Sequence, residues 1–179
     1  MLNDVERILL SEEEIREKVK EIGSQITKDY QGEKLLIITI LKGSVIFAAD
    51  LLREIKTPVE IDFMCLSSYG SGSESSGVVK IVKDLNEPIE GKNVLIIEDI
   101  LDSGNTLTHL VKLLGTRNPK SIRIATLLDK PDRRVAEVDV AYKGFSIPDE
   151  FVIGYGLDYA EKYRNLPFVG ILKREVYEK

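Results

Sequence analysis

Three acidic side chains and a small polar turn form the part of the sequence best suited to chemistry. Glu98, Asp99 and Asp102 follow the apolar run 94–97. The turn after them consists of Ser103, Gly104, Asn105 and Thr106. Hydroxyls and backbone N–H groups at a helix N-terminus favour a bound phosphate, and adjacent carboxylates suit a sugar diol or a hydrated Mg²⁺ ion. Taken singly, these residues could cap a helix or face solvent, but together they predict a site for a phosphorylated sugar.

The composition restricts the other chemistry available to the chain. Cys65 and His109 are the only cysteine and histidine in the sequence, so a metal site of clustered thiolates or imidazoles cannot form. Any metal must be bound by oxygen atoms, which favours Mg²⁺. Cys65 lies in the apolar stretch 61–66, where we expect a buried, unreactive thiol. A P-loop site is unsupported, because the motif G-x-x-x-x-G-K-[ST] does not occur. A Rossmann site is unsupported as well, because Gly70-Ser71-Gly72 continues into Ser73, Glu74 and Ser75.

Length, charge and hydropathy predict one globular domain over residues 1–179. Hydrophobic residues make up 43% of the chain, yet no apolar run approaches the roughly 20 residues of a membrane span, so no membrane partner is expected. The net charge of −5 argues against a broad basic surface for nucleic acid. The N-terminus lacks the basic and apolar regions of a secretion signal, from which we expect a cytoplasmic protein.

Apolar periodicity predicts an α/β fold. Ser11 and Glu14 form a capping-box pattern that begins an amphipathic helix extending to Tyr30. Strands are expected at 35–40, 59–66, 78–82, 94–97, 122–128, 138–142, 151–155 and 168–172, and further helices at 45–54 and 105–114. This alternation is typical of a mostly parallel, twisted central sheet flanked by helices, with ligands at the carboxyl ends of its strands.

The segment 94–106 resembles the phosphoribosyl-pyrophosphate motif of type I phosphoribosyltransferases, in which an acidic pair and the pattern D-S-G-x-T follow an apolar strand. Three further segments, 41–44, 127–131 and 151–167, are similar to the hypoxanthine-guanine branch of that family. The resemblance covers nearly the whole chain. It implies the type I phosphoribosyltransferase fold, transfer of a phosphoribosyl group from phosphoribosyl pyrophosphate to a 6-oxopurine such as hypoxanthine or guanine, and Mg²⁺ as the cofactor.

The same resemblance implies roles for individual residues around the sugar. Asp102 would accept a proton from the purine as the general base. The phosphoribosyl group would be bound by Glu98, Asp99, Asp102, Ser103, Gly104, Asn105 and Thr106. Leu41, Lys42 and Gly43 would bind pyrophosphate together with Arg164. In the family this turn contains a cis peptide bond, which would join Leu41 to Lys42.

Other residues would bind the base and the metal. By resemblance, Phe151 would stack on the purine and the Val152 backbone would bond to it. The ammonium group of Lys130 would favour a 6-oxo group over a 6-amino group, because an ammonium can only donate. Asp158 would contribute to the purine site and also to the metal site. The metal-binding set is then Glu98, Asp99 and Asp158.

The resemblance also implies features beyond the site. Ser68 and Tyr69 begin a Ser/Gly-rich segment, 67–77, expected to be a mobile loop that closes over the reacting centre. Segments 1–10 and 145–179 would form a small hood. A homo-oligomer, either a dimer or a tetramer, is expected as well.

Two alternatives stay open at this point. One is a regulatory protein that uses the same fold to sense nucleotides or phosphoribosyl pyrophosphate. The other is a transferase that acts on xanthine, uracil or a nonpurine base. In addition, Ser103 stands where many relatives carry threonine, and Asn105 where some carry lysine. Either difference could tune phosphate affinity.

Overall fold

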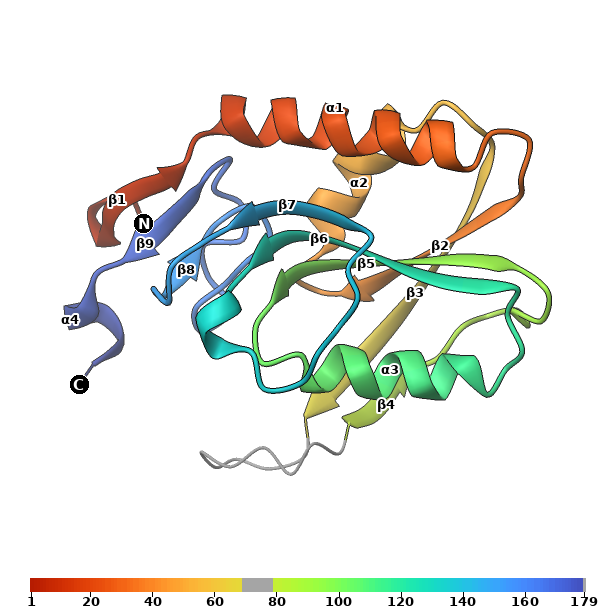
Figure 1. Ribbon diagram of the computed structural model, residues 1–179. Helices are drawn as coiled ribbons and strands as arrows, with labels where there is room; N and C mark the ends of the chain where they lie inside the picture. Colours follow the sequence, from red (N-terminus) through yellow and green to blue (C-terminus); the bar gives the residue numbers. More distant parts are fainter. Residues whose placement is uncertain (69–78, 179) are drawn as a thin grey trace.

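The structure is a computed structural model that describes residues 1–68 and 79–178. Among these residues, six strands form a central sheet in the order β4-β3-β2-β5-β6-β7. Helices α1 and α2 cover one face of this sheet and α3 covers the other (Figure 1). The elements are β1 Val5–Leu10, α1 Glu12–Asp29, β2 Leu35–Leu41, α2 Val45–Glu54, β3 Val59–Ser68, β4 Val79–Lys83, β5 Asn93–Leu101, α3 Asn105–Gly115, β6 Ser121–Asp129, β7 Tyr142–Ser146, β8 Val152–Ile153, β9 Val169–Leu172 and α4 Arg174–Tyr177, with short 3₁₀ helices at Leu2–Asp4 and Pro131–Arg133.

The central strands are buried on both faces, as their continuous apolar runs predicted. β2 pairs in parallel with both β3 and β5, and β5 pairs in parallel with β6. Alternate residues then face opposite sides: Ile37 and Leu95 pack in the core beneath α1 and α2, whereas Ile38 and Ile96 pack in the core beneath α3. All four are fully buried. Polar side chains of these strands can therefore reach a ligand only at the strand ends.

Helix α1 begins as the sequence predicted. The Ser11 hydroxyl accepts a hydrogen bond from the Glu14 amide at 3.2 Å, and the Glu14 carboxylate accepts one from the Ser11 amide at 2.8 Å. These two bonds satisfy N–H groups that the first turn of a helix leaves free. The apolar stripe of the helix, which includes Ile15 and Ile22, is buried against α2 and the sheet.

A second, smaller sheet joins the two ends of the chain. Strands β1, β9 and β8 pair in that order, all antiparallel. This sheet lies beside the carboxyl end of the central sheet, and both chain termini are at the same end of the molecule (Figure 1). The strand β1 was not predicted, because its partner β9 is more than 150 residues away along the chain and the segment has no local turn that would mark a hairpin.

Two predicted strands were misplaced. The strand expected at 138–142 begins only at Tyr142 and continues to Ser146, because Val138 and Val140 instead pack from an extended segment against the core beneath α3. The strand expected at 151–155 is limited to Val152–Ile153. It ends there because Gly154, Tyr155 and Gly156 have φ angles of 93°, 49° and 99°, and three consecutive positive values lie outside the extended region of a regular strand.

The segment expected as a loop at 67–77 is only partly described. Ser67 and Ser68 belong to β3, which pairs in antiparallel fashion with β4, so the strand extends further than predicted. Tyr69 and the rest of the expected loop lie outside the described residues.

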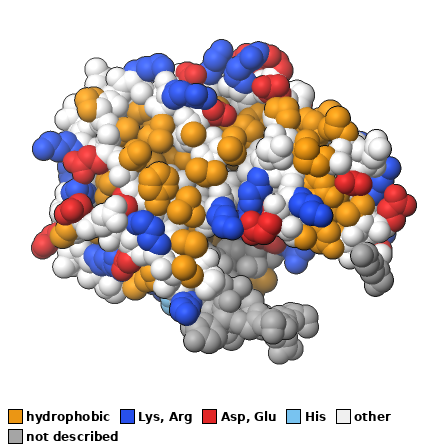
Figure 2. All heavy atoms as spheres, turned by 180° about the vertical axis from the view of Figure 1, so that it is seen from behind, with side chains coloured by type: hydrophobic (Ala, Val, Ile, Leu, Met, Phe, Trp, Pro, Cys, Tyr) orange, Lys and Arg blue, Asp and Glu red, His pale blue; other side chains and the backbone are white. Residues whose placement is uncertain are grey.

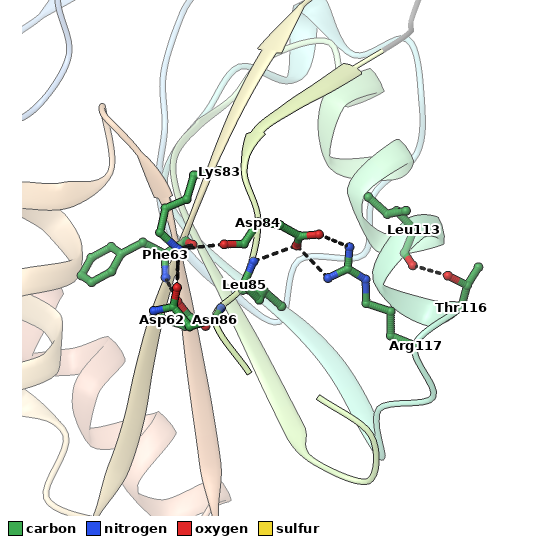
Figure 3. A network of polar contacts seen from close by, with 9 residues as sticks. All are labelled: Asp62, Phe63, Lys83, Asp84, Leu85, Asn86, Leu113, Thr116 and Arg117. Atoms are coloured by element: carbon green, nitrogen blue, oxygen red, sulfur yellow. Dashed lines mark hydrogen bonds and ion pairs between the residues drawn. The ribbon is translucent and has the colours of Figure 1, made fainter. Parts of the chain in front are cut away.

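A polar network holds the chain that leaves β4, on the side of the sheet near the end of α3 (Figure 3). The buried carboxylate of Asp62 accepts hydrogen bonds from the Phe63 and Asn86 amides, each at 2.7 Å. The Lys83 ammonium lies 3.6 Å from the same carboxylate and donates to the Phe63 carbonyl at 2.9 Å. Because Asp62 lies on β3 and Lys83 ends β4, the network fastens together the two strands that flank residues 69–78.

A neighbouring ion pair continues this network to α3. Both outer nitrogens of the Arg117 guanidinium donate to the Asp84 carboxylate, at 2.7 and 2.8 Å. This two-point contact lowers the pKa of Asp84, because the guanidinium stabilises the charged form. The chain after β4 is thus attached to Arg117, two residues beyond the last residue of α3 (Figure 3).

We predict that Asp62→Ala destabilises the fold in a pH-dependent way. Burial alone would raise the pKa of Asp62, but the two amides and Lys83 outweigh it and lower the pKa from its ordinary value. A lowered pKa stabilises the fold above the unfolded value and loses that effect as the pH falls through the folded value. We expect a loss of about 2–3 kcal/mol in the free energy of unfolding at neutral pH. Urea titrations at decreasing pH should show this loss shrinking as the Asp62 carboxylate becomes protonated in the folded state.

The matched control for this prediction is Glu60→Ala. Glu60 lies on the same strand and forms an ion pair with Lys92 at 2.6 Å, but its side chain is 59% exposed. An exposed pair contributes little, so this substitution should leave the unfolding curve nearly unchanged. Equal destabilisation of both variants, or a loss for Asp62→Ala that does not depend on pH, would contradict the role given to Asp62.

Candidate active site

The predicted site residues gather where the parallel strands end. Thr39 of β2 pairs with Ile97 of β5, and Leu101 of β5 pairs with Asp129 of β6, so these strands finish at the same edge. The arrowheads of β5, β6 and β7 point to this edge, beside the small sheet (Figure 1). The turn after β2, the acidic residues of β5 and Lys130 after β6 are therefore brought to one side of the molecule, as expected.

The turn between β5 and α3 has the geometry of a phosphate-binding loop. Gly104, at the N-cap of α3, has a φ of 86°, and a Cβ there would lie 2.4 Å from the Ala136 carbonyl oxygen. Glycine is thus required for both conformation and space. The Ser103 hydroxyl accepts from the Asn105 amide at 3.3 Å. A hollow of about 250 Å³ is lined by Glu98, Asp99, Ile100, Leu101, Asp102, Ser103, Gly104, Thr106 and Leu107.

The acidic pair at the end of β5 is partly buried. Burial raises the pKa of Glu98 well above its ordinary value, and the adjacent Asp99 charge raises it further. Burial raises the pKa of Asp99 as well, although amide donors and the charge of Arg164 act in the opposite direction. The pair is consequently costly to keep ionised in the absence of a positive partner or a hydroxyl ligand.

The turn after β2 approaches this pair at backbone distance. The peptide bond between Leu41 and Lys42 is cis, which confirms what the family resemblance implied. A Cβ on Gly43 would lie 1.7 Å from Asp99 Oδ2, and a Cβ on Gly156 would lie 2.0 Å from the Gly43 carbonyl oxygen. The turn, the acidic pair and the segment that follows β8 are therefore in direct contact, and this contact is possible only because two of the positions lack a side chain.

The segment after β8 contributes the cation Arg164 to the site. Arg164 Nη2 lies 2.9 Å from Asp158 Oδ1, and Arg164 Nη1 donates to the Gly156 carbonyl at 2.7 Å. Arg164 Nε is buried and has no hydrogen-bond partner among the described residues. On the exposed side, Lys42 Nζ pairs with Glu161 Oε2 at 2.9 Å. Lys42 and Arg164 thus lie around the same turn, as predicted for a pyrophosphate site.

The residues expected to bind a base also lie together. Lys130 is buried, and its ammonium donates to the Glu150 carbonyl at 2.7 Å, which places it next to Phe151. The Phe151 ring stacks on Tyr177 of α4 at a centroid distance of 4.8 Å and meets the edge of Tyr159 at 5.6 Å. With 37% of its surface exposed, Phe151 retains area for a ligand, whereas Val152 is buried and offers only its backbone.

Asp102 is held close to two arginines that the sequence analysis did not single out. Arg133 Nε lies 2.9 Å from Asp102 Oδ1, although this buried oxygen has no hydrogen-bond partner of good geometry among the described residues. Arg134 Nε donates to the Asp102 backbone carbonyl at 3.2 Å. The pair of arginines after Lys130 was visible in the sequence, but neighbouring charges are usually solvated and gave no reason to place them at the site.

Four other residues named from the sequence are not placed in this site. Ser68 ends β3, and its side chain is not described; Tyr69 is outside the described residues. His109 is exposed on α3. Cys65 is a free thiol on β3 that is half-buried rather than fully buried, because β3 borders the short antiparallel strand β4 near the edge of the sheet.

Comparisons with known proteins agree with this geometry. The family model described as the phosphoribosyl transferase domain matches residues 7–160. The chain is 56% identical over 178 residues to the hypoxanthine-guanine phosphoribosyltransferase of Bacillus subtilis, covering 99% of both proteins. It is 53% identical over its whole length to the bifunctional protein TilS/HprT of Listeria monocytogenes, but spans only 28% of that protein's length.

Solved structures show the same likeness. A hypoxanthine phosphoribosyltransferase from Staphylococcus aureus superposes with a TM-score of 0.97 at 55% identity, covering 100% of this chain and 97% of that one. A hypoxanthine-guanine phosphoribosyltransferase from Bacillus anthracis, with a HEPES molecule in its active site, gives a TM-score of 0.91 at 51% identity over 94% of this chain and 99% of that one.

The fold and the site define a type I phosphoribosyltransferase, and the chain belongs to the phosphoribosyltransferase family. Within that family it is a member of the hypoxanthine-guanine branch, as the resemblance of its motifs had indicated.

We predict that Gly43→Ala disrupts the site without unfolding the protein. The added Cβ would overlap Asp99 Oδ2, so the acidic pair or the turn must move. We expect kcat/KM for phosphoribosyl transfer to fall at least about tenfold, because displacements of this size misplace reacting groups. Steady-state kinetics on folded protein, verified by circular dichroism, would measure the loss.

Gly115→Ala provides the control for this substitution. A Cβ at Gly115 would meet nothing within 4 Å, and the residue is the last one of α3, so alanine should be accepted there with unchanged kinetics. If Gly43→Ala retained the activity of the wild type, the contact between the turn and the acidic pair would have no role in the reaction.

Proposed function

We propose that the protein transfers the 5-phosphoribosyl group of phosphoribosyl pyrophosphate to hypoxanthine, guanine or both, giving IMP or GMP and releasing pyrophosphate, as a step of purine salvage. The observation that carries the proposal is the direct contact between three segments: the 41–43 turn, the acidic pair of β5 and the segment after β8. Each segment suits one part of the substrates, and relatives with the same segments are named for this reaction.

The sugar phosphate would bind along β5 and the turn that follows it. Backbone N–H groups at the start of α3, together with the hydroxyls of Ser103 and Thr106, suit a 5′-phosphate, and Asn105 adds an amide. Glu98 and Asp99 would accept hydrogen bonds from the two ribose hydroxyls. A neutral diol relieves the desolvation of the pair without adding negative charge.

Pyrophosphate would leave between Lys42 and Arg164. Arginine offers parallel donors that match phosphate oxygens, and the buried, unpartnered Nε of Arg164 shows spare donor capacity in the described site. Backbone groups of the turn between Leu41 and Gly43 would contribute further contacts. Holding the leaving group in this way stabilises the charge that develops on it as the bond to the sugar breaks.

The base would lie between Lys130 and Phe151. An aromatic face suits a flat purine, and the Val152 backbone supplies donor and acceptor groups at a fixed place. The Lys130 ammonium selects a 6-oxo group, since it can only donate. Asp102 would accept the proton from the imidazole nitrogen of the purine; its buried Oδ1, near Arg133 but without a well-aligned donor, is available for that step.

Mg²⁺ fits the residues present. Among the described residues no group of three or more His, Cys, Asp or Glu side chains is arranged to enclose a metal ion. Mg²⁺ needs no such enclosure, because it keeps several waters and typically binds one or two carboxylates and substrate phosphates. Glu98, Asp99 and Asp158 are the residues that would hold it. When bound, the ion would offset the negative charge of pyrophosphate and of the desolvated acidic pair.

The remaining expectations form part of this proposal. The small sheet would serve as the hood over the base, and the protein would act as a homo-oligomer in the cytoplasm. Among the described residues no helix is long and apolar enough to cross a membrane. Acidic and basic side chains are interspersed on the face shown in Figure 2, which presents no broad basic area for nucleic acid. Nothing in the comparisons supports the regulatory alternative.

We predict product formation with hypoxanthine and guanine, and little or none with adenine or uracil. Each base, and xanthine as a fifth, would be incubated with phosphoribosyl pyrophosphate and Mg²⁺, and nucleotides would be separated by chromatography. Preference for 6-oxopurines follows from the donor-only ammonium of Lys130. A protein that binds phosphoribosyl pyrophosphate but forms no nucleotide with any base would be a sensor, and the proposed activity would be wrong.

We also predict that Asp102→Asn lowers kcat by about 100-fold or more, because an amide cannot accept the proton. The KM for phosphoribosyl pyrophosphate should change little, since the backbone amides of the turn remain. The control is Asp139→Asn. Asp139 is exposed in the segment between the 3₁₀ helix Pro131–Arg133 and β7, and this variant should match the wild type. Equal losses in kcat and in cosubstrate affinity for Asp102→Asn would rule out its role as the base.

A further inference from the structure

A buried carboxylate outside the predicted site holds two cations. Asp129 ends β6, and its side chain is 3% exposed. Its Oδ1 contacts Arg134 Nη2, and its Oδ2 lies 2.8 Å from Lys143 Nζ on β7. A carboxylate so far from water requires compensation of this kind, because a buried charge left unpaired is strongly destabilising.

Only one of the two cations reaches the site. Besides contacting Asp129, Arg134 donates from Nε to the Asp102 carbonyl at 3.2 Å. Its guanidinium therefore bridges the end of β6 and the start of the turn before α3. Lys143, whose side chain is 46% exposed, contacts the same carboxylate from β7 and makes no contact with Asp102 within the described part of the chain.

The residues after Arg134 hold the next peptide of the turn. The amides of Val135 and Ala136 donate to the Ser103 carbonyl, at 2.9 and 3.0 Å. The carbonyls of Asp102 and Ser103 thus both point toward the segment 134–136. In a trans peptide the N–H points away from the C=O, so the amides of Ser103 and Gly104 are turned to the opposite side, where a phosphate can accept from them.

We propose that Arg134, anchored by Asp129, is a positioning residue that orients the Asp102–Gly104 turn for binding the 5′-phosphate. This role rests on the proposed function. Arg134 touches no substrate in this account. It acts through the backbone of the turn, by fixing the direction of the peptide groups and the place of the Asp102 side chain. Because the anchor is a buried ion pair, the orientation is present before any ligand binds.

The test compares Arg134→Met with Lys143→Met. Each substitution removes one of the two cations on Asp129 and keeps an unbranched side chain of moderate length. If Arg134 only stabilised the fold, the two variants would affect activity to a similar degree once their stabilities are matched. The positioning role predicts that only Arg134→Met weakens binding of phosphoribosyl pyrophosphate and of GMP, by about tenfold or more, while Lys143→Met remains within about twofold of the wild type.

Arg134→Lys separates charge from bridging. Lysine keeps a positive charge next to Asp129, but all its donors lie on one nitrogen, so it cannot place donors at two separate positions as Nε and Nη2 of the guanidinium do. We expect Arg134→Lys to be more stable than Arg134→Met and to keep most of the defect in binding. If Arg134→Met does not fold, the comparison of Arg134→Lys with Lys143→Met carries the test alone.

The measurements are KM for phosphoribosyl pyrophosphate, KM for hypoxanthine, and GMP affinity by calorimetry, with melting temperature as the index of stability. The KM for hypoxanthine should change less than that for phosphoribosyl pyrophosphate, because the base contacts other segments. Equal binding losses in the Arg134 and Lys143 variants, or wild-type affinity in the Arg134 variants, would overturn the proposal. GMP affinity is measured without turnover, so it tests Arg134 even if the wild type proves inactive with every base.

Discussion

The desolvated acidic pair at the end of β5 is the constraint around which the rest of the site is arranged. Glu98 and Asp99 sit side by side where burial raises the pKa of both. Like charges at such a place are unfavourable unless a ligand supplies hydroxyl donors or positive charge. The pair is therefore prepared for a bound partner, and the surrounding backbone, at Gly43 above all, approaches it closely enough to leave no room for a side chain.

Asp129, on the neighbouring strand β6, is a buried carboxylate whose charge the fold does neutralise. Asp129 has Arg134 and Lys143 on its two oxygens. By contrast, the Arg164 guanidinium, whose charge lowers the pKa of Asp99, is itself paired with Asp158. A fully compensated carboxylate maintains structure, whereas an uncompensated pair beside an anion-binding turn is what a sugar diol and a hydrated cation require.

Sequence patterns predicted the elements that depend on local order. Buried strands and the capped helix α1 follow from apolar runs and a capping box, and the site turn follows from its own residues. The misplaced strands depend on longer-range conditions. β7 needs Gly144, where a Cβ would meet the Leu127 carbonyl oxygen at 2.3 Å, and glycine in a segment usually argues against a strand. β8 ends at three consecutive residues with positive φ, and a positive φ at Tyr155 could not be predicted from its residue type. The bridge through Arg134 joins two loops, so no local pattern could show it.

The ion pairs of the site differ in how readily a polyanionic substrate can exchange them. Lys42 with Glu161, and Arg133 with Asp102, have side chains about half exposed or more. Exposed pairs contribute roughly 0–1 kcal/mol, so these cations can turn to phosphate oxygens at little cost. In the pair of Arg134 with Asp129 the carboxylate is only 3% exposed, so this pair does not exchange in this way. Arg164 is also held more firmly than Lys42, because it pairs with Asp158 at 2.9 Å and donates to the Gly156 carbonyl. In the proposed site, exposed cations such as Lys42 can therefore adapt to the substrate, while Arg134 and Arg164 keep the geometry of the backbone.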